Sequence, residues 1–140
     1  MIYYQAIDIR VAEPICHEIF EEQQKAEFGQ HISRNADTLS IAAFDDREVI
    51  GAIIAKVEYD ALEVAQLTVK KDYRKQGIGR QLLNEIERIA KEKGIINITL
   101  TTQSFQGTRF YEEQGYRIYG ELKDMPRKGE NRIFFYKRLK

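Results

Sequence analysis

The chain has 140 residues, of which 43% are hydrophobic, and its 22 basic residues are balanced by 22 acidic ones. This length and composition predict a single folded domain over residues 1–140, while the zero net charge argues against a general nucleic-acid binder, which usually carries a basic surplus. No apolar run approaches the roughly 18 residues of a membrane span and the N-terminus lacks the pattern of a secretory signal, so we expect a cytoplasmic protein with no membrane partner.

The first half of the chain predicts one helix and several strands. Alternating apolar residues indicate a strand at about residues 2–8. A helix is expected from Pro14 to about Ala26, with the proline in its first turn, where proline is tolerated. Residues 28–37 form either an irregular arm or a short second helix. An antiparallel meander follows, with strands expected at residues 38–44, 49–59 and 62–69.

The clearest helix in the chain is expected at residues 77–93. Its apolar residues recur at helical spacing and form a single stripe along the helix. The members of this stripe are Ile78, Leu82, Leu83, Ile86, Ile89 and Ala90. Glu87 and Lys91 are four residues apart, and we expect them to form an ion pair on the opposite, exposed face.

The last third of the chain returns to the sheet. We expect a helix at residues 104–114, with Ser104 as its N-cap. Three further strands are expected at residues 95–101, 116–122 and 132–139. The element order is therefore β-α-(α)-β-β-β-α-β-α-β-β, an α/β class. Its strand–helix–strand crossover makes two strands parallel and the sheet mixed.

Two glycines, Gly77 and Gly79, stand where the third meander strand gives way to the long helix. A helix start offers unpaired N–H groups and a partial positive charge, and both suit a phosphate. Basic residues surround this turn, namely Lys70, Lys71, Arg74, Lys75 and Arg80. The P-loop string is absent, and the dinucleotide fingerprint lacks its third glycine because Leu82 occupies that place. The residues alone leave either a pyrophosphate site or a plain tight corner.

The pattern Arg74-x-x-Gly77-x-Gly79, together with "FYEEQGY" at residues 110–116, resembles the GCN5-related N-acetyltransferase (GNAT) superfamily in a small single-domain bacterial form. The resemblance implies a mixed six- to seven-stranded sheet flanked by about four helices, with acetyl-CoA as cosubstrate. It also implies a bulge in the strand ending "QLTV", which would splay that strand from its neighbour. The cofactor-binding residues it implies are Leu67, Thr68, Val69, Arg74, Lys75, Gln76, Gly77, Ile78, Gly79, Arg80, Ser104 and Phe110.

For catalysis, the resemblance implies that Tyr111 is the acid that protonates the departing thiolate. A phenol, with a pKa of about 10, stays protonated at neutral pH. Glu63 is the expected base for the attacking amine, Glu58 and Tyr59 are weaker alternatives, and water alone is the remaining route. Many relatives carry asparagine where this chain has Ser104, but a serine can still form hydrogen bonds, so Ser104 is kept among the expected cofactor-binding residues. No metal site is expected, since one cysteine and two scattered histidines give no ligand spacing.

The function expected is acetyl transfer from acetyl-CoA to a primary amine of a small molecule or peptide, by direct attack in a ternary complex. Two alternatives stay open: a non-catalytic acyl-CoA sensor or scaffold, and a general anion or nucleotide binder. His31 falls in the arm where relatives bind acceptors. The strand "RIFFYKRL" at residues 132–139 is apolar on both faces, which allows a homodimer.

Overall fold

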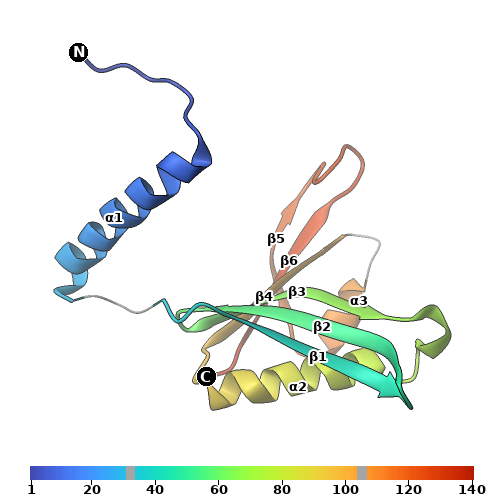
Figure 1. Ribbon diagram of the computed structural model, residues 1–140. Helices are drawn as coiled ribbons and strands as arrows, with labels where there is room; N and C mark the ends of the chain where they lie inside the picture. The colour runs from blue at the N-terminus through green and yellow to red at the C-terminus, as the bar shows by residue number, and fades with distance from the viewer. Residues whose placement is uncertain (31–33, 104–106) are drawn as a thin grey trace. The chain divides into compact units, whose positions relative to one another are not determined.

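The computed structural model describes residues 1–30, 34–103 and 107–140. The chain divides into two compact units, Met1–Arg34 and Asn35–Lys140 (Figure 1). The described helices include none that is long and apolar enough to cross a membrane.

The first unit contains one helix, α1, over Ile9–Phe28. The Asp8 side chain accepts a hydrogen bond from the Arg10 N–H and caps the start, and Gly29 ends the helix in the left-handed conformation. The helix therefore begins earlier than predicted, with Pro14 inside it. The strand predicted at residues 2–8 is wrong, since these residues form no ladder. A strand needs a hydrogen-bonded neighbour, and the described part of this unit offers no second strand.

The second unit is built on one six-stranded sheet in the order β1-β2-β3-β4-β6-β5. Its strands are β1 Asp37–Asp45, β2 Glu48–Glu58, β3 Ala61–Val69, β4 Asn97–Gln103, β5 Arg117–Leu122 and β6 Arg132–Arg138. Only the pair β3–β4 is parallel, as the crossover between them requires, and the other pairs are antiparallel. The predicted mixed α/β sheet is confirmed.

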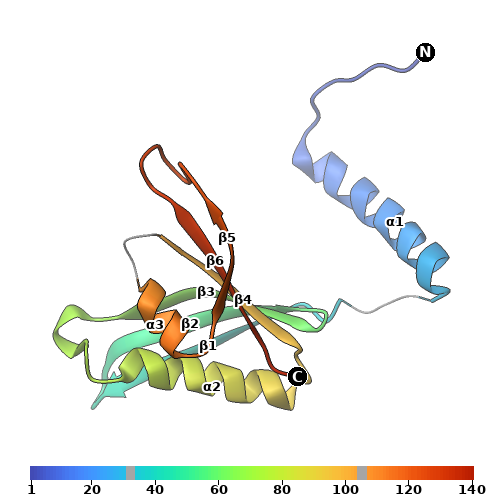
Figure 2. The ribbon, with the colours of Figure 1, turned by 180° about the vertical axis from the view of Figure 1, so that it is seen from behind.

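Two α-helices lie on one face of this sheet, α2 over Ile78–Glu92 and α3 over Thr108–Glu113 (Figures 1 and 2). A short 3-10 turn, η1, covers Lys71–Tyr73 ahead of α2. The described chain thus has three α-helices where about four were expected. Helix α3 starts later than predicted, with Gly107 as its N-cap, and Ser104 lies outside the described residues.

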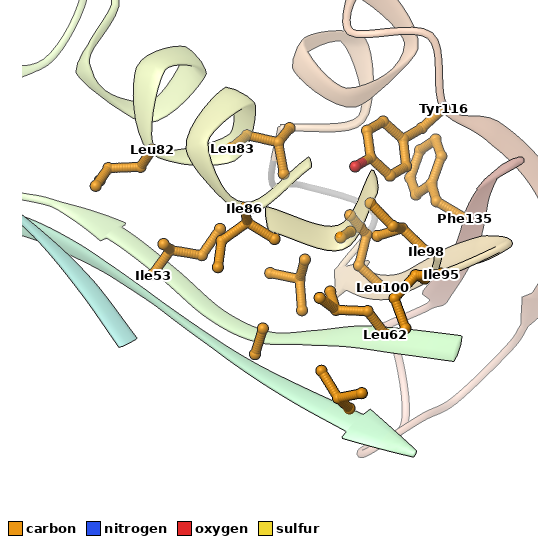
Figure 3. Close-up of a cluster of buried hydrophobic side chains, with 14 of the residues drawn as sticks. Ile53, Leu62, Leu82, Leu83, Ile86, Ile95, Ile98, Leu100, Tyr116 and Phe135 are labelled. Atoms are coloured by element: carbon orange, nitrogen blue, oxygen red, sulfur yellow. The ribbon is translucent and has the colours of Figure 1, made fainter. Parts of the chain in front are cut away.

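The core lies between α2 and the sheet (Figure 3). The apolar stripe of α2 supplies Leu82, Leu83, Ile86 and Ala90, all buried, as its spacing predicted. Burying each large apolar side chain contributes roughly 1.5–3 kcal/mol, so this stripe fixes α2 firmly on the sheet. The pairing predicted for Glu87 is wrong, because this residue is only 6% exposed and lies among the core residues.

Strands β3 and β4 separate soon after they meet. Their register runs only from Ala61 opposite Asn97 to Glu63 opposite Thr99. Two residues further along β3, Ala65 is an extra residue relative to β2, which is the implied bulge. A bulge bends its strand and breaks the ladder. The second half of β3 therefore has no ladder with β4, and the Val69 carbonyl instead accepts a hydrogen bond from Arg74.

Candidate active site

The turn before α2 leaves backbone donors without helical partners. Gly77 is the N-cap at φ 80° and ψ 10°, and no side chain caps the helix. The first helical hydrogen bond runs from the Gln81 N–H to the Gly77 carbonyl at 3.0 Å. The N–H groups of residues 78–80 therefore have no acceptor within the helix. They lie at a cavity of about 550 Å³ lined by Val69, Tyr73, Arg74, Lys75, Gln76, Gly77, Ile78, Gly79, Arg80, Phe110 and Gln114.

The two glycines serve different purposes. Gly77 has a left-handed backbone, which a residue with a Cβ adopts only with strain. Gly79 is helical, and a Cβ built on it would lie 3.6 Å from the Phe110 ring and 3.8 Å from the Val69 side chain. Those are ordinary contacts, so Gly79 is not needed for the fold itself. Its missing side chain instead leaves space open beside the free amides.

Positive charge is available at this turn. Lys70 is paired with Glu48 at 2.6 Å, and Arg74 donates from Nε to the Val69 carbonyl at 3.0 Å. By contrast, neither Lys75 nor Arg80 forms an ion pair within residues 34–103 and 107–140. Free amides and unpaired cations together make a site suited to a diphosphate.

The loop that carries these cations is tied to the turn between β1 and β2. The Tyr73 hydroxyl donates to Asp45 Oδ2 at 2.6 Å, and this hydrogen bond raises the pKa of Tyr73 to about 12. The phenol therefore stays neutral at any physiological pH. Tyr73 also lines the cavity, so its bond to Asp45 fixes one wall of the anion site.

A second cavity of about 510 Å³ continues from the first. It is lined by Leu67, Thr68, Val69, Arg74, Gly79, Thr102, Gly107, Phe110 and Tyr111. Four of these residues also line the first cavity, namely Val69, Arg74, Gly79 and Phe110. The combined space therefore runs from the start of α2, along the half of β3 that has no ladder with β4, to α3. An extended ligand with a diphosphate at one end and amides along its length fits this shape and polarity.

Tyr111 stands at the α3 end of this space. Its ring packs against three aromatic rings, with centroid distances of 5.1 Å to Phe110, 6.0 Å to Tyr116 and 5.6 Å to Phe135. Burial raises the pKa of Tyr111 above its ordinary value. Among the residues that the structure describes, none accepts a hydrogen bond from its hydroxyl. A neutral phenol with a free hydroxyl therefore forms part of the cavity wall.

Glu63 lies elsewhere. It alternates with the buried residues Leu62 and Val64 and so points to the sheet face opposite α2. There it lines a separate cavity of about 350 Å³ with Lys56 and Thr99, its register partners on β2 and β4. The structure thus brings together the predicted residues of the 67–80 segment with Phe110 and Tyr111, but not Glu63.

Several residues of the site were not predicted, namely Tyr73, Thr102, Gly107 and Gln114. Tyr73 sits inside the basic run "KKDYRK", and the interruption of that run by an aromatic residue was the available signal. Predicted roles for Ser104 and His31 fall on residues outside the described ranges. The described residues contain no group of three or more metal-ligating side chains.

Comparison with known proteins gives a consistent result. The model of the Acetyltransferase (GNAT) family matches residues 4–116. A Bacillus subtilis (strain 168) protein described as an acetyltransferase is 30% identical over 118 residues, which are 81% of this chain and 80% of that protein. The crystal structure of an acetyltransferase from Bacillus cereus ATCC 14579 is 30% identical in sequence and superposes with a TM-score of 0.82. The matched region covers 98% of this chain and 97% of that protein's chain.

A second similar structure was solved with a ligand. This Bacillus anthracis str. Ames protein, described as a streptothricin acetyltransferase, was crystallised in complex with acetyl coenzyme A. It is 27% identical in sequence, with a TM-score of 0.66, and the matched region covers 73% of this chain and 62% of that protein's chain.

Proposed function

The chain belongs to the acetyltransferase (GNAT) family, and from that premise we propose that it transfers an acetyl group from acetyl-CoA to a primary amine of a small molecule or peptide. One observation carries the proposal. The two joined cavities lead from the free amides at the start of α2, along the half of β3 that has no ladder with β4, to Tyr111 on α3.

The binding role falls on this chain's backbone. The N–H groups of residues 76–80 hold the diphosphate, with Lys75 and Arg80 supplying charge. Backbone groups of Leu67 and Val69 bind the amides of the pantetheine arm, since that part of β3 has no ladder with β4. Gly79 keeps the space beside the amides clear, and Phe110 closes the side of the cavity.

The reaction requires an N–C bond to form between the amine and the acetyl carbon while the C–S bond of the thioester breaks. The amine loses one proton, and the departing thiolate gains one. Tyr111 donates that second proton and is reprotonated from solvent. A phenol suits this step because burial keeps it protonated, and such general acid catalysis typically contributes about 10² to 10⁴ in rate.

The proton leaving the amine has two routes, Glu63 or water. Glu63 lines a cavity on the opposite face of the sheet, where β3 and β4 last pair. An acceptor that approaches from this face reaches the carboxylate before it reaches the thioester. If Glu63 is the base, Glu63→Gln lowers kcat near neutral pH and leaves acetyl-CoA binding unchanged. If water is the base, Glu63→Gln leaves kcat unchanged.

The test of the function is release of free CoA thiol from acetyl-CoA in the presence of a panel of amines. The expected result is amine-dependent thiol release together with mass-spectrometric detection of the acetylated amine. Acetyl-CoA binding without turnover across a broad panel would support the sensor instead. Competition by ATP as strong as that by acetyl-CoA would support the general anion binder.

We also propose that residues 1–140 act as one acetyltransferase domain. The family match over residues 4–116 supports this, since it extends across both compact units.

A further inference from the structure

A charged residue lies on the apolar face of α2. Glu87 stands among Leu83, Ile86 and Ala90, which are 0% exposed, and is itself only 6% exposed. A carboxylate removed from water is costly unless an opposite charge and hydrogen bonds compensate it. The reaction proposed above does not use this residue, so its burial needs another explanation.

The compensating charge comes from β6. Lys137 Nζ lies 2.5 Å from Glu87 Oε1, although the two residues are 50 positions apart in the sequence. The Tyr116 hydroxyl points to the other oxygen, Glu87 Oε2, at 3.5 Å, and the Lys137 ammonium lies 5.5 Å from the centre of the Tyr116 ring. The pair therefore joins α2 to β6, and both of its members also contact Tyr116, which lies shortly after the end of α3.

The same ammonium also holds the end of α3. Lys137 Nζ donates to the Gln114 carbonyl at 2.9 Å, and Gln114 is the C-cap of that helix. Carbonyls at a helix C-terminus lack helical partners and carry partial negative charge, so a cation there is doubly favourable. Next to it, Gly115 has a left-handed backbone with φ 89°, which a residue with a Cβ adopts only with strain.

Helix α3 depends on such outside contacts. It has only six residues, none of them buried, and a helix this short is not stable by itself. Yet it carries Phe110 and Tyr111, which line the cavity. Tyr116 is directly linked to this helix, because its backbone N–H donates to the Tyr111 carbonyl at 3.0 Å.

We propose that Glu87 and Lys137 are positioning residues, which fix α3 through the Gln114 carbonyl so that the Tyr111 hydroxyl faces the cavity. The inference rests on the proposed function for its catalytic consequence. Glu87 keeps the lysine ammonium in place and also belongs to α2, whose first turn forms the anion site. The pair thus links the helix that binds the diphosphate to the helix that holds the phenol.

The test uses the double variant Glu87→Leu with Lys137→Met, because replacing a buried ion pair by apolar residues of similar size often preserves stability. We expect this variant to melt near the wild-type temperature and to bind acetyl-CoA as the wild type does. We expect its kcat to fall roughly 10- to 100-fold, since small misplacements of a catalytic group are costly. In a Tyr111→Phe background the same replacement should cost no further kcat, because both changes act through one hydroxyl.

Amide hydrogen exchange gives a readout that needs no turnover. In the double variant, the amides of α3 should exchange about tenfold faster while those of α2 keep their wild-type rates. The matched control is Arg88→Met with Glu92→Leu, which removes an exposed ion pair from α2 and should change neither quantity.

Unchanged exchange in α3, or a kcat loss of equal size with and without the Tyr111 hydroxyl, would overturn the positioning role. A wild-type protein that acetylates no amine would instead overturn the proposed function, and the exchange result would still decide whether the pair holds α3.

Discussion

The two helices that form the site, α2 and α3, are held in opposite ways. Helix α2 has 15 residues and fixes itself to the sheet with its own apolar stripe. Helix α3 has six residues, none of them fully buried. It is held by Phe110 and Tyr111, which pack partly buried against the core, and by contacts from Lys137 and Tyr116. The turn proposed to bind the diphosphate therefore belongs to a helix with strong support of its own, while Tyr111 lies on a helix that depends on its neighbours.

We therefore expect binding and chemistry to be separable in this protein. Changes at the start of α2 should weaken acetyl-CoA binding with little effect on the fold. Changes around α3 should slow turnover while binding persists.

Removing the Tyr111 hydroxyl should have the largest effect. We expect Tyr111→Phe to lower kcat by about 10² to 10⁴ and to leave acetyl-CoA affinity unchanged, because the ring and its aromatic contacts remain. Steady-state kinetics and calorimetric titration measure the two quantities. Tyr119→Phe is the matched control, since Tyr119 is an exposed tyrosine on β5. Equal turnover by both variants would exclude the acid role.

Breaking the buried pair should chiefly affect stability. Lys137→Met leaves Glu87 buried without its cation, and such a loss typically lowers the free energy of unfolding by about 3–5 kcal/mol. Arg88→Met removes an exposed arginine from the pairs with Glu85 and Glu92 and should cost under about 1 kcal/mol. Denaturant unfolding measures both. Similar losses in the two variants would contradict the burial argument.

A negative charge at the start of α2 should separate binding from folding. We expect Gly79→Glu to weaken acetyl-CoA binding by about 100-fold or more, because like charges in close contact cost several kcal/mol. The fold should not suffer, since an acidic residue is favourable in a first helical turn and glycine is a poor helix former. Asn84→Glu adds the same charge to an exposed position of α2 and is the control. Binding lost equally in both variants would point to net charge rather than to the site.

The pH dependence of turnover should follow Tyr111. Burial raises the pKa of Tyr111 above its ordinary value of 10.0, so the phenol keeps its proton to higher pH than a free tyrosine does. We expect kcat to stay high as the pH rises to 10 and to fall only above it, with no such fall in Tyr111→Phe. An alkaline decline well below pH 10 would contradict this assignment.

The smallest effect is expected at Tyr73. Its hydroxyl holds the basic loop to Asp45 across an exposed hydrogen bond, and a typical bond of this kind contributes about 0.5–1.5 kcal/mol. Tyr73→Phe should therefore raise the KM for acetyl-CoA by a few-fold and leave kcat unchanged. A fall in kcat without a change in KM would show that Tyr73 acts in the chemistry instead.

The sequence was a good guide where the structural cause is local. The glycine turn, the stripe of α2 and the meander follow from residue spacing within single elements, and all appear as predicted. It failed where the cause lies in distant residues. The alternation at residues 2–8 does not reveal that the described part of its unit contains no partner strand. Glu87 occupies a stripe position four residues after Leu83, but its partner Lys137 is 50 residues away.

The candidate site shows the same limit. Tyr111 and the 76–80 turn were placed on the correct elements, and the structure joins them through the two cavities. Glu63 alternates with the buried residues Leu62 and Val64 and lies on the sheet face opposite α2, whereas Tyr111 packs against the core on the α2 face. The alternation was visible in the sequence, but the face that α3 covers depends on how a distant element packs, so the sequence could not separate the two residues.

The most direct test of the account is a titration of the wild-type protein with acetyl-CoA, observed by the backbone amide resonances. We expect one saturable site, with the largest shifts at residues 76–80 and along residues 66–69, the part of β3 that has no ladder with β4. No change at millimolar ligand, or largest shifts at residues away from both cavities, would contradict the claim that the start of α2 binds the diphosphate.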